Sequence, residues 1–291
     1  MPSLKEVKTR IGSVISTQQI TKAMKMVAAA KLRKSQDRII QMRPFAKKMT
    51  AILQNLSGGN TDGDNWYGKV RTEEKILIVA INSDRGLCGS FNSNTVKGVL
   101  RLIEEKYSTQ HAKKNVTILP IGKKALDFFT KRNFPVQVDY ATMFHGLTFE
   151  KSAEAAAFMM DAFKNGEYDK IEIVYNQFKN VATQVLVVEQ FLPVLPIEKG
   201  KASEIDYIFQ PNKEEIIAGI IPKSLKVQLF KTLLDSNASE NGARMTAMDK
   251  ANENAGELLK ELKLTYNRTR QAAITKEILE IVAGAEALKS A

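Results

Sequence analysis

Residues 17–36, TQQITKAMKMVAAAKLRKSQ, lie inside a longer stretch with one repeating apolar pattern. Alternate steps of three and four residues from Leu4 to Leu56 meet an apolar side chain at twelve of sixteen positions. This spacing, kept over many turns, is typical of a coiled-coil seam. It predicts one helix over residues 3–56, about 80 Å long at 1.5 Å per residue, with a local kink but no end at Pro44.

The seam has a polar interval formed by Gln18, Thr21 and Lys25, close to the alanines at 28–30. Small residues let helices approach closely, and polar seam positions fix the register of a coiled coil at some cost in stability. From the pattern alone, the interval fits a register device as well as it fits a functional contact.

A second seam occupies the C-terminal segment, residues 213–291. Pro222 suits the first turn of a helix, and the same stepping runs from Val227 to Tyr266. Near residue 272 the apolar stripe shifts by one position, a stutter that changes supercoil winding. We therefore expect a second helix of about 100 Å from about residue 222, paired with the first as an antiparallel intramolecular coiled coil.

Between the seams the pattern changes to that of a separate α/β domain at residues 73–210, after a loop at 57–72. The expected strands are 75–81, 115–121, a short one at 136–140, 170–178, 181–194 and a further one at 206–209. The expected helices are 92–108, 122–132 and 149–165. Alternation of strand and helix predicts a mostly parallel, Rossmann-like sheet, with the strands at 170–178 and 181–194 close enough to form a hairpin.

The basic surplus belongs to one end of the chain. The whole sequence carries 43 Lys and Arg against 32 Asp and Glu, a net charge of +11. Residues 1–56 hold 12 basic and 2 acidic side chains, and the rest of the chain is almost balanced. A basic surface indicates an acidic partner, which can be nucleic acid, anionic lipid or protein.

Cysteine and histidine usage argues against redox or metal chemistry. Cys88 is the single cysteine, so no intramolecular disulfide forms, and His111 and His145 are too far apart in sequence to suggest a zinc site. We expect a reducing compartment. No apolar run reaches the roughly 18 residues of a membrane span, and the first residues match neither a signal nor a transit peptide, so we expect them to be mature structure.

The loop SDRGLCGSFN, residues 83–92, follows the first strand, where a phosphate-binding loop would lie. It lacks both the GxxxxGK[ST] and the GxGxxG pattern, so a nucleotide site is disfavoured, although the helix start could bind another anion. We expect a tight loop in which Gly86 and Gly89 supply unusual backbone angles, with Asp84, Arg85, Gly86 and Cys88 exposed to a partner.

The chemistry of the loop is expected to be modest. Cys88 fits an inert, buried or half-buried thiol better than a nucleophile. Asp84 and Arg85 are expected to pair with each other more readily than with a partner, and His145 has no evident carboxylate partner. No catalytic residue, metal ligand or cofactor site stands out.

Three stretches together resemble the gamma subunit of the F-type ATP synthase. They are residues 17–36, residues 83–92 and ARMTAMDKANENAGELLKELKLTYNRTRQAAITKEILEIVAGAEAL at 243–288. The resemblance covers the whole chain, including the order of long helix, α/β domain and long helix. Ser90 departs from the family's usual glycine. The cysteine-containing regulatory insert of chloroplast members is absent, so no thiol switch of that kind is expected.

The resemblance implies a rotor shaft without catalysis of its own and without a cofactor. Its terminal helices would form a coiled coil inside the hexameric ring of alpha and beta subunits. Its α/β domain would lie below that ring, and this lower part would carry the epsilon subunit and dock on the membrane c-ring. Proton flow would turn the shaft and drive the beta sites. The implied place is peripheral, on the cytoplasmic side of a bacterial plasma membrane, with the matrix side of a mitochondrial inner membrane as the less favoured location.

The resemblance also implies site residues. Contacts with the catalytic subunits carry over to Met24, Lys25, Arg244, Gln271 and Thr275. The late stripe would form an apolar bearing tip of Ile274, Ile278, Ile281, Val282, Ala285 and Leu288, and apolar contacts lack directional bonds that would hold one rotational angle.

Two other classes remain open on the residues alone. A nucleic-acid or anionic-membrane binder would gather its cations on one face beside aromatic or apolar insertion residues, whereas the cations here spread around a seam with almost no aromatics. A Rossmann-type enzyme is disfavoured by the missing fingerprint. The resemblance implies neither nucleic-acid binding nor membrane insertion, and the basic helix would face acidic patches on a protein ring.

Overall fold

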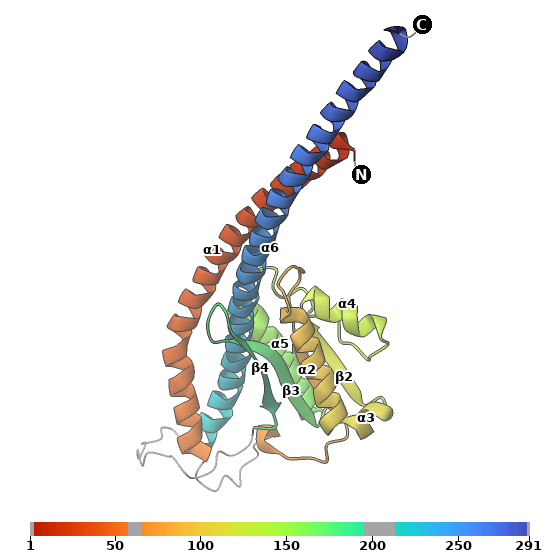
Figure 1. The fold of residues 1–291 in the computed structure, drawn as a ribbon. Helices are drawn as coiled ribbons and strands as arrows, with labels where there is room; N and C mark the ends of the chain where they lie inside the picture. Colours follow the sequence, from red (N-terminus) through yellow and green to blue (C-terminus); the bar gives the residue numbers. More distant parts are fainter. Residues whose placement is uncertain (1–2, 58–65, 195–212, 290–291) are drawn as a thin grey trace. The chain divides into compact units, whose positions relative to one another are not determined.

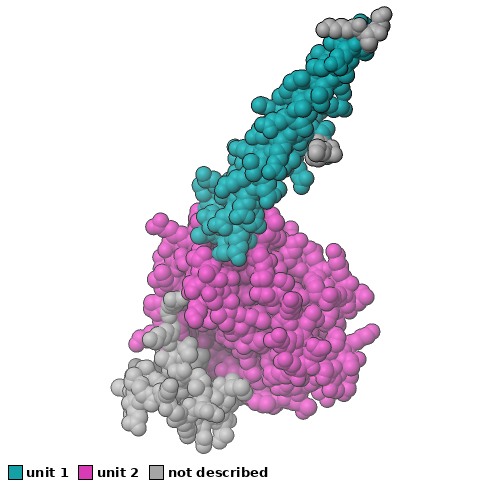
Figure 2. All heavy atoms as spheres, viewed as in Figure 1, with its two compact units in different colours: residues 1–27, 245–291 teal, residues 28–244 magenta. Residues whose placement is uncertain are grey.

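The computed structural model describes residues 3–57, 66–194 and 213–289 (Figure 1). The chain divides into two compact units, one of residues 1–27 with 245–291 and one of residues 28–244 (Figure 2). The two long helices, α1 (Leu4–Ser57) and α6 (Lys213–Lys289), contribute to both units. Pro44 lies inside α1 and does not end it, as predicted.

The unit of residues 1–27 and 245–291 is an antiparallel pair of helices. Lys25 Nζ lies 2.5 Å from Asp249 Oδ1, and the Gln18 amide lies against Gly256, so residue numbers rise along α1 as they fall along α6. The seam positions of both helices are buried or half-buried between them; the most buried are Val7, Thr21, Met248, Ala255 and Leu262. The predicted antiparallel coiled coil is confirmed.

The pairing stops before α6 does. Every side chain from Arg270 to Leu288 is exposed, whereas Tyr266 and Thr269 are still half-buried. The one-residue shift of the apolar stripe near residue 272 therefore falls where α6 loses its partner helix. Beyond this point α1 no longer dictates which positions of α6 are apolar.

The unit of residues 28–244 is built around one four-stranded sheet. Its strands are β1 (Ile76–Ile81), β2 (Val116–Ile121), β3 (Lys170–Phe178) and β4 (Gln184–Leu192), in the order β2-β1-β3-β4. β2, β1 and β3 are parallel, and β3 pairs antiparallel with β4 as a hairpin, both as predicted. All six residues of β1 are buried, because a central parallel strand is covered on both faces.

Helices cover both faces of the sheet (Figure 1). The helices of this unit are α2 (Phe91–Lys106), α3 (Ser108–Ala112), α4 (Lys123–Lys131) and α5 (Phe149–Lys164), with a 3₁₀ turn η1 at Trp66–Gly68. α2 and α4 bury Val99 and Phe129 with Ile78 of β1. α5 and the first part of α6 bury Phe163 and Leu229 in the core of the opposite face.

α1 and α6 also pack together within this unit. Ala28, Leu32 and Ile39 on α1 are at most 5% exposed. Ser35 Oγ donates to Asn237 Oδ1 of α6 at 2.7 Å, so a polar bond sits within the apolar seam. Such a bond is satisfied in one register only and therefore specifies how the helices align.

Two expected boundaries are wrong. α6 begins at Lys213, so Pro222 lies inside the helix and does not start it. Proline removes one helix hydrogen bond, and burial of Ile221 and Leu225 around it in the sheet core offsets that loss. The helix expected at 92–108 is two, α2 and α3, meeting at the fully buried Tyr107.

The strand expected at 136–140 is only a single bridge between Val136 and Ile118. Pro135 has no N–H to donate to a ladder, and Val138 is exposed, so nothing is gained by extending the pairing. The further strand expected at 206–209 lies outside the described residues. None of the helices in the described ranges is both long and apolar enough to span a membrane.

Gly122 should tolerate no side chain, because it closes against the start of the loop after β1. Its φ is +109°, and a Cβ there would lie 2.2 Å from the Asn82 carbonyl oxygen. We expect Gly122→Ala to lower the free energy of unfolding by about 3 kcal/mol or more, measured by urea unfolding followed by circular dichroism. Gly12→Ala on α1, where nothing lies within 4 Å, is the control and should leave stability equal or slightly higher. Equal midpoints for the two variants would contradict this account.

Candidate functional site

The loop between β1 and α2 has an unusual backbone. Leu87 has a φ of +63° and Gly89 a φ of +58°, so both are left-handed. The expectation for Gly89 is confirmed, but the second left-handed residue is Leu87 and not Gly86. A leucine in this conformation is strained by about 1 kcal/mol, so the surrounding contacts must hold the loop in place.

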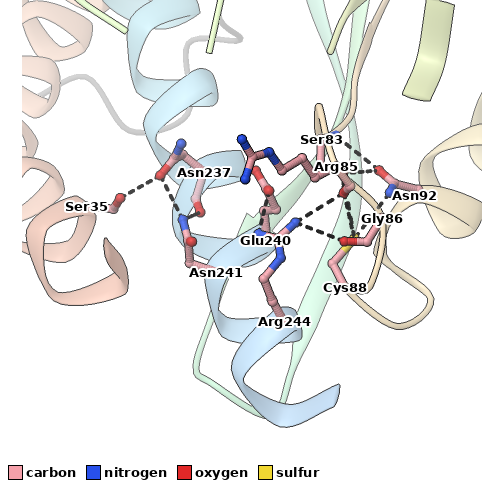
Figure 3. Close-up of polar contacts among 10 residues, drawn as sticks. All are labelled: Ser35, Ser83, Arg85, Gly86, Cys88, Asn92, Asn237, Glu240, Asn241 and Arg244. Carbon is pink, nitrogen blue, oxygen red and sulfur yellow. Dashed lines mark hydrogen bonds and ion pairs between the residues drawn. The ribbon is translucent and has the colours of Figure 1, made fainter. Parts of the chain in front are cut away.

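Polar side chains at the start of the loop and in the first turn of α2 hold the loop in place. Asn92, in the first turn of α2, accepts from the backbone N–H of Ser83 at 3.0 Å and from its hydroxyl at 2.9 Å. Its amide nitrogen donates to Cys88 Sγ at 3.2 Å (Figure 3). The Ser83 hydroxyl also lies 2.6 Å from the Arg85 carbonyl oxygen, so its one proton is shared between the two acceptors. These bonds close a small ring of contacts around the thiol.

Cys88 is therefore not exposed, although it was expected to be presented with the rest of the loop. It is 1% exposed, because the loop folds its side chain inward over Ser83 and Asn92. Burial raises the pKa of the Cys88 thiol, and the Ser83 hydrogen bond and the Arg244 charge only partly oppose this. The burial predicted for this thiol is confirmed, and its inertness stays a prediction.

Arg244 of α6 lies over the same loop (Figure 3). Its Nη2 donates to the carbonyl oxygens of Arg85 at 3.1 Å and Gly86 at 3.3 Å. Its Nη1 donates to Glu240 Oε1, one helical turn earlier, at 2.6 Å. The structure thus brings Arg244 together with the loop, a juxtaposition that spacing in the sequence did not suggest.

Glu240 holds the Arg244 guanidinium in place from inside the protein. Its side chain is only 12% exposed, and that of Arg244 only 13%. Burial raises the pKa of the Glu240 carboxyl, while the charge and hydrogen bond of Arg244 act in the opposite direction. An ion pair this enclosed fixes the orientation of the guanidinium far better than an exposed pair would.

Asp84 does not pair with Arg85 as expected. Its carboxylate accepts from the backbone N–H of Lys123 at 3.1 Å, at the start of α4. His145 Nε2 lies 3.6 Å from the other carboxylate oxygen, so His145 does have a carboxylate partner, contrary to expectation. The helix N-terminus attracts the negative charge of Asp84 away from its neighbour in sequence.

From Asp84 to Cys88, the exposed residues of the loop are Arg85 and Leu87. Leu87 is 66% exposed despite its size. Asp84 and Gly86 are half-buried. Of the loop residues expected to face a partner, Arg85 is therefore the most accessible, and Leu87 is one that the sequence did not single out.

The other expected contact residues lie on the helices of the coiled-coil unit. Met24 is half-buried, and Lys25 is engaged with Asp249 of α6. Gln271 and Thr275 are exposed, one turn apart, and the Thr275 hydroxyl donates to the Gln271 carbonyl oxygen at 2.9 Å.

The residues of the expected bearing tip all lie on the unpaired end of α6. Ile274, Ile278, Ile281, Val282 and Leu288 are 46 to 83% exposed, and Ala285 is exposed as well. Leu279 is 63% exposed and widens the apolar surface beyond the stripe. Large apolar side chains gathered on one exposed segment are typical of a surface that a partner covers.

One buried ionic cluster escaped the sequence analysis. Glu172 and Lys170 at the start of β3 are almost fully buried, and they connect to Lys106 and Glu73 through contacts of 2.5 Å. Two charged residues that alternate with isoleucines at the start of the strand KIEIVYNQF are the signal that could have revealed it. The cluster ties α2 and the segment before β1 to β3.

The comparisons with known proteins decide the family. The family model described as ATP synthase matches residues 3–288. A curated relative from Cytophaga hutchinsonii, the ATP synthase gamma chain, is 57% identical over 295 residues and covers 100% of both chains. The chain belongs to the ATP synthase gamma-chain family. A gamma chain is a non-catalytic subunit of that enzyme.

Further relatives agree with this assignment. The ATP synthase gamma chain of Flavobacterium psychrophilum is 54% identical and covers 99% of this chain and 100% of the relative. A chain in the central stalk and c-ring of the Tetrahymena thermophila mitochondrial ATP synthase has a TM-score of 0.55 and 28% identity, covering 80% of this chain and 99% of the other.

A chain of the Euglena gracilis mitochondrial ATP synthase in rotational state 3 has a TM-score of 0.66 at 23% identity and covers 98% of this chain and 94% of the other, which supports the gamma-chain fold.

Within the described ranges, no cluster of three or more His, Cys, Asp or Glu side chains could hold a metal ion.

The largely enclosed pair of Glu240 and Arg244 should contribute to stability where an exposed pair does not. We expect Glu240→Ala to lower the free energy of unfolding by about 2–4 kcal/mol, because it leaves the guanidinium without its carboxylate. Glu280→Ala removes the same i,i+4 contact, at 3.6 Å to Lys276, on the exposed end of α6 and should change little. Urea midpoints test this, and an equal effect of the two substitutions would show that enclosure of the pair is unimportant.

Proposed function

We infer that this chain is the central rotor shaft of an F-type ATP synthase, coupling proton flow through the c-ring to the catalytic cycle of the beta subunits. The observation that carries this function is the end of α6 beyond its pairing with α1, where every side chain from Arg270 to Leu288 is exposed, including the large apolar side chains of Ile274, Ile278, Leu279, Ile281, Val282 and Leu288. A helix end of this kind would be unfavourable in water, and a surrounding ring of protein would cover it.

The physical demands on a shaft match the elements of this chain. Transmission of torque requires resistance to twisting over a long span, which two paired helices provide. Rotation requires small barriers against the bearing. Apolar side chains such as Ile278 and Ile281 make contacts without directional bonds, so no single angle is strongly preferred. We propose the apolar stripe of Ile274, Ile278, Ile281, Val282, Ala285 and Leu288 as the bearing surface.

The basic character of α1 supports a protein ring as the partner. Lys8, Arg10, Lys31 and Arg38 are all exposed, as are most other cations of this helix. They surround the helix and do not gather on one face, which suits a shaft enclosed on several sides. We propose that they face acidic side chains of the alpha and beta subunits.

The remaining contacts follow from the same function. We propose Met24, Lys25, Arg244, Gln271 and Thr275 as contacts or supports for contacts with the catalytic subunits at particular rotational angles. The epsilon subunit and the c-ring would bind the part of the chain that holds the α/β domain. Since the curated relatives described above are bacterial, we propose a peripheral position on the cytoplasmic side of a bacterial plasma membrane.

Assembly with the catalytic subunits tests this function directly. We expect the purified chain to hydrolyse no ATP by itself and to form a stable ATPase when mixed with the alpha and beta subunits of its own organism. Gel filtration followed by an ATPase assay of the complex measures both. Failure of the three chains to co-elute would contradict the rotor assignment.

A charge on the bearing surface should impair coupling. We expect Ile281→Asp to reduce proton-driven ATP synthesis by about tenfold or more, because a charge against an apolar sleeve loses its hydration. Glu277→Gln, on the same exposed segment, is the control and should behave like the wild type. Synthesis is measured in inverted membrane vesicles, and an unchanged rate for Ile281→Asp would sink the bearing proposal.

A further inference from the structure

We propose that Arg244 is a positioning residue that latches the 83–89 loop onto α6, so that Arg85 and Leu87 are held outward for a partner. The inference rests on the proposed rotor function for its consequence in coupling, but the latch itself is a property of this chain. It differs from the simpler idea that the Arg244 guanidinium itself reaches the catalytic subunits.

The guanidinium is already occupied by the chain's own acceptors. Nη2 bonds the Arg85 and Gly86 carbonyl oxygens, Nη1 bonds Glu240, and the side chain is 13% exposed (Figure 3). A planar fork can serve two neighbouring carbonyls and a carboxylate at once, which a lysine ammonium cannot do with the same geometry. A partner carboxylate would have to displace these contacts before it could bind Arg244.

The loop needs such a latch. Leu87 is held in the left-handed region, which is unfavourable for leucine, with most of its side chain in solvent. An exposed apolar side chain on strained backbone contributes nothing to the folding of the isolated chain, and strain of this kind gathers at functional sites. Arg244 holds the loop from α6, and Asn92 holds it from α2 through its bonds to Ser83 and Cys88.

The two supports act on the same loop from different elements. This separates the latch from a direct contact, because Asn92 can be changed while the guanidinium keeps its charge and place. If Arg244 acts through the loop, loosening the loop at Asn92 should produce the same defect as loss of Arg244. If Arg244 acts by touching a partner, the change at Asn92 should leave coupling intact.

Cys88 is a natural probe of the latch. It is the only cysteine of the sequence, and its side chain points inward from the loop and is 1% exposed. The full chain is treated with a biotin maleimide, both alone and after assembly with alpha and beta subunits. The chain is then separated from the other subunits, and the label on Cys88 is measured. We expect Arg244→Ala and Asn92→Ala to raise the labelling rate about tenfold or more. Arg270→Ala, an exposed arginine on the unpaired end of α6, is the matched control and should not change the rate.

Proton-driven ATP synthesis per proton is then compared among the same variants, together with Arg244→Lys. The latch predicts that Asn92→Ala lowers coupling as Arg244→Ala does, and that Arg244→Lys keeps the charge without restoring coupling or thiol protection. Circular dichroism verifies that each variant is folded, and Arg244→Lys keeps the test decisive if Asn92→Ala does not fold.

An unchanged labelling rate in Arg244→Ala would overturn the latch, and so would full rescue of coupling by Arg244→Lys. Failure of the wild-type chain to assemble would refute the rotor function and not the latch. The labelling rate of each variant relative to the wild type is measured in the free chain and does not depend on assembly.

Discussion

The structure depends on the antiparallel packing of α1 against α6. Two helices of this length gain stability mainly by burying a narrow apolar stripe against each other. The stripe contains Thr21 and Ser35 as well as apolar residues, and both are less than 9% exposed. The bond from Ser35 to Asn237 is made in one register only, so polar positions determine how the two helices align while apolar positions supply the stabilisation.

The unequal reach of the two helices determines where function lies. α6 continues beyond the last half-buried position, Thr269, into a segment whose apolar side chains are exposed. The sheet domain is different, because helices cover its core on both faces, and among its four strands only β4 has exposed large apolar side chains, at Val185, Leu186 and Val188. What remains exposed and apolar there is local, as at Leu87. The chain therefore presents two kinds of surface, an apolar helix end and a latched loop, and both fit a subunit that acts by contact and not by chemistry.

Much of the architecture followed from pattern alone, because periodicity reports burial directly. The seam positions from Leu4 to Met49 are all buried or half-buried, and β3 has the predicted bounds. Pro222 was misjudged, since a rule about local hydrogen bonding cannot anticipate how much burial surrounds the proline. The strand expected at 136–140 failed for a similar reason, because β-branched residues form a strand only where a neighbouring edge and a surface to cover exist.

The sequence by itself determined the two seams, their antiparallel pairing, the order of strands and helices, and the family to which the motifs point. Each of these depends on spacing along the chain, which is visible in one dimension. Only the tertiary structure decided that Arg244 closes over the loop, that Cys88 turns inward, and that Asp84 faces Lys123 and His145. The contacts of Arg244 and Asp84 join residues far apart in sequence, and those of Cys88 depend on the local path of the loop. Neither kind leaves a periodic trace for a pattern to reveal.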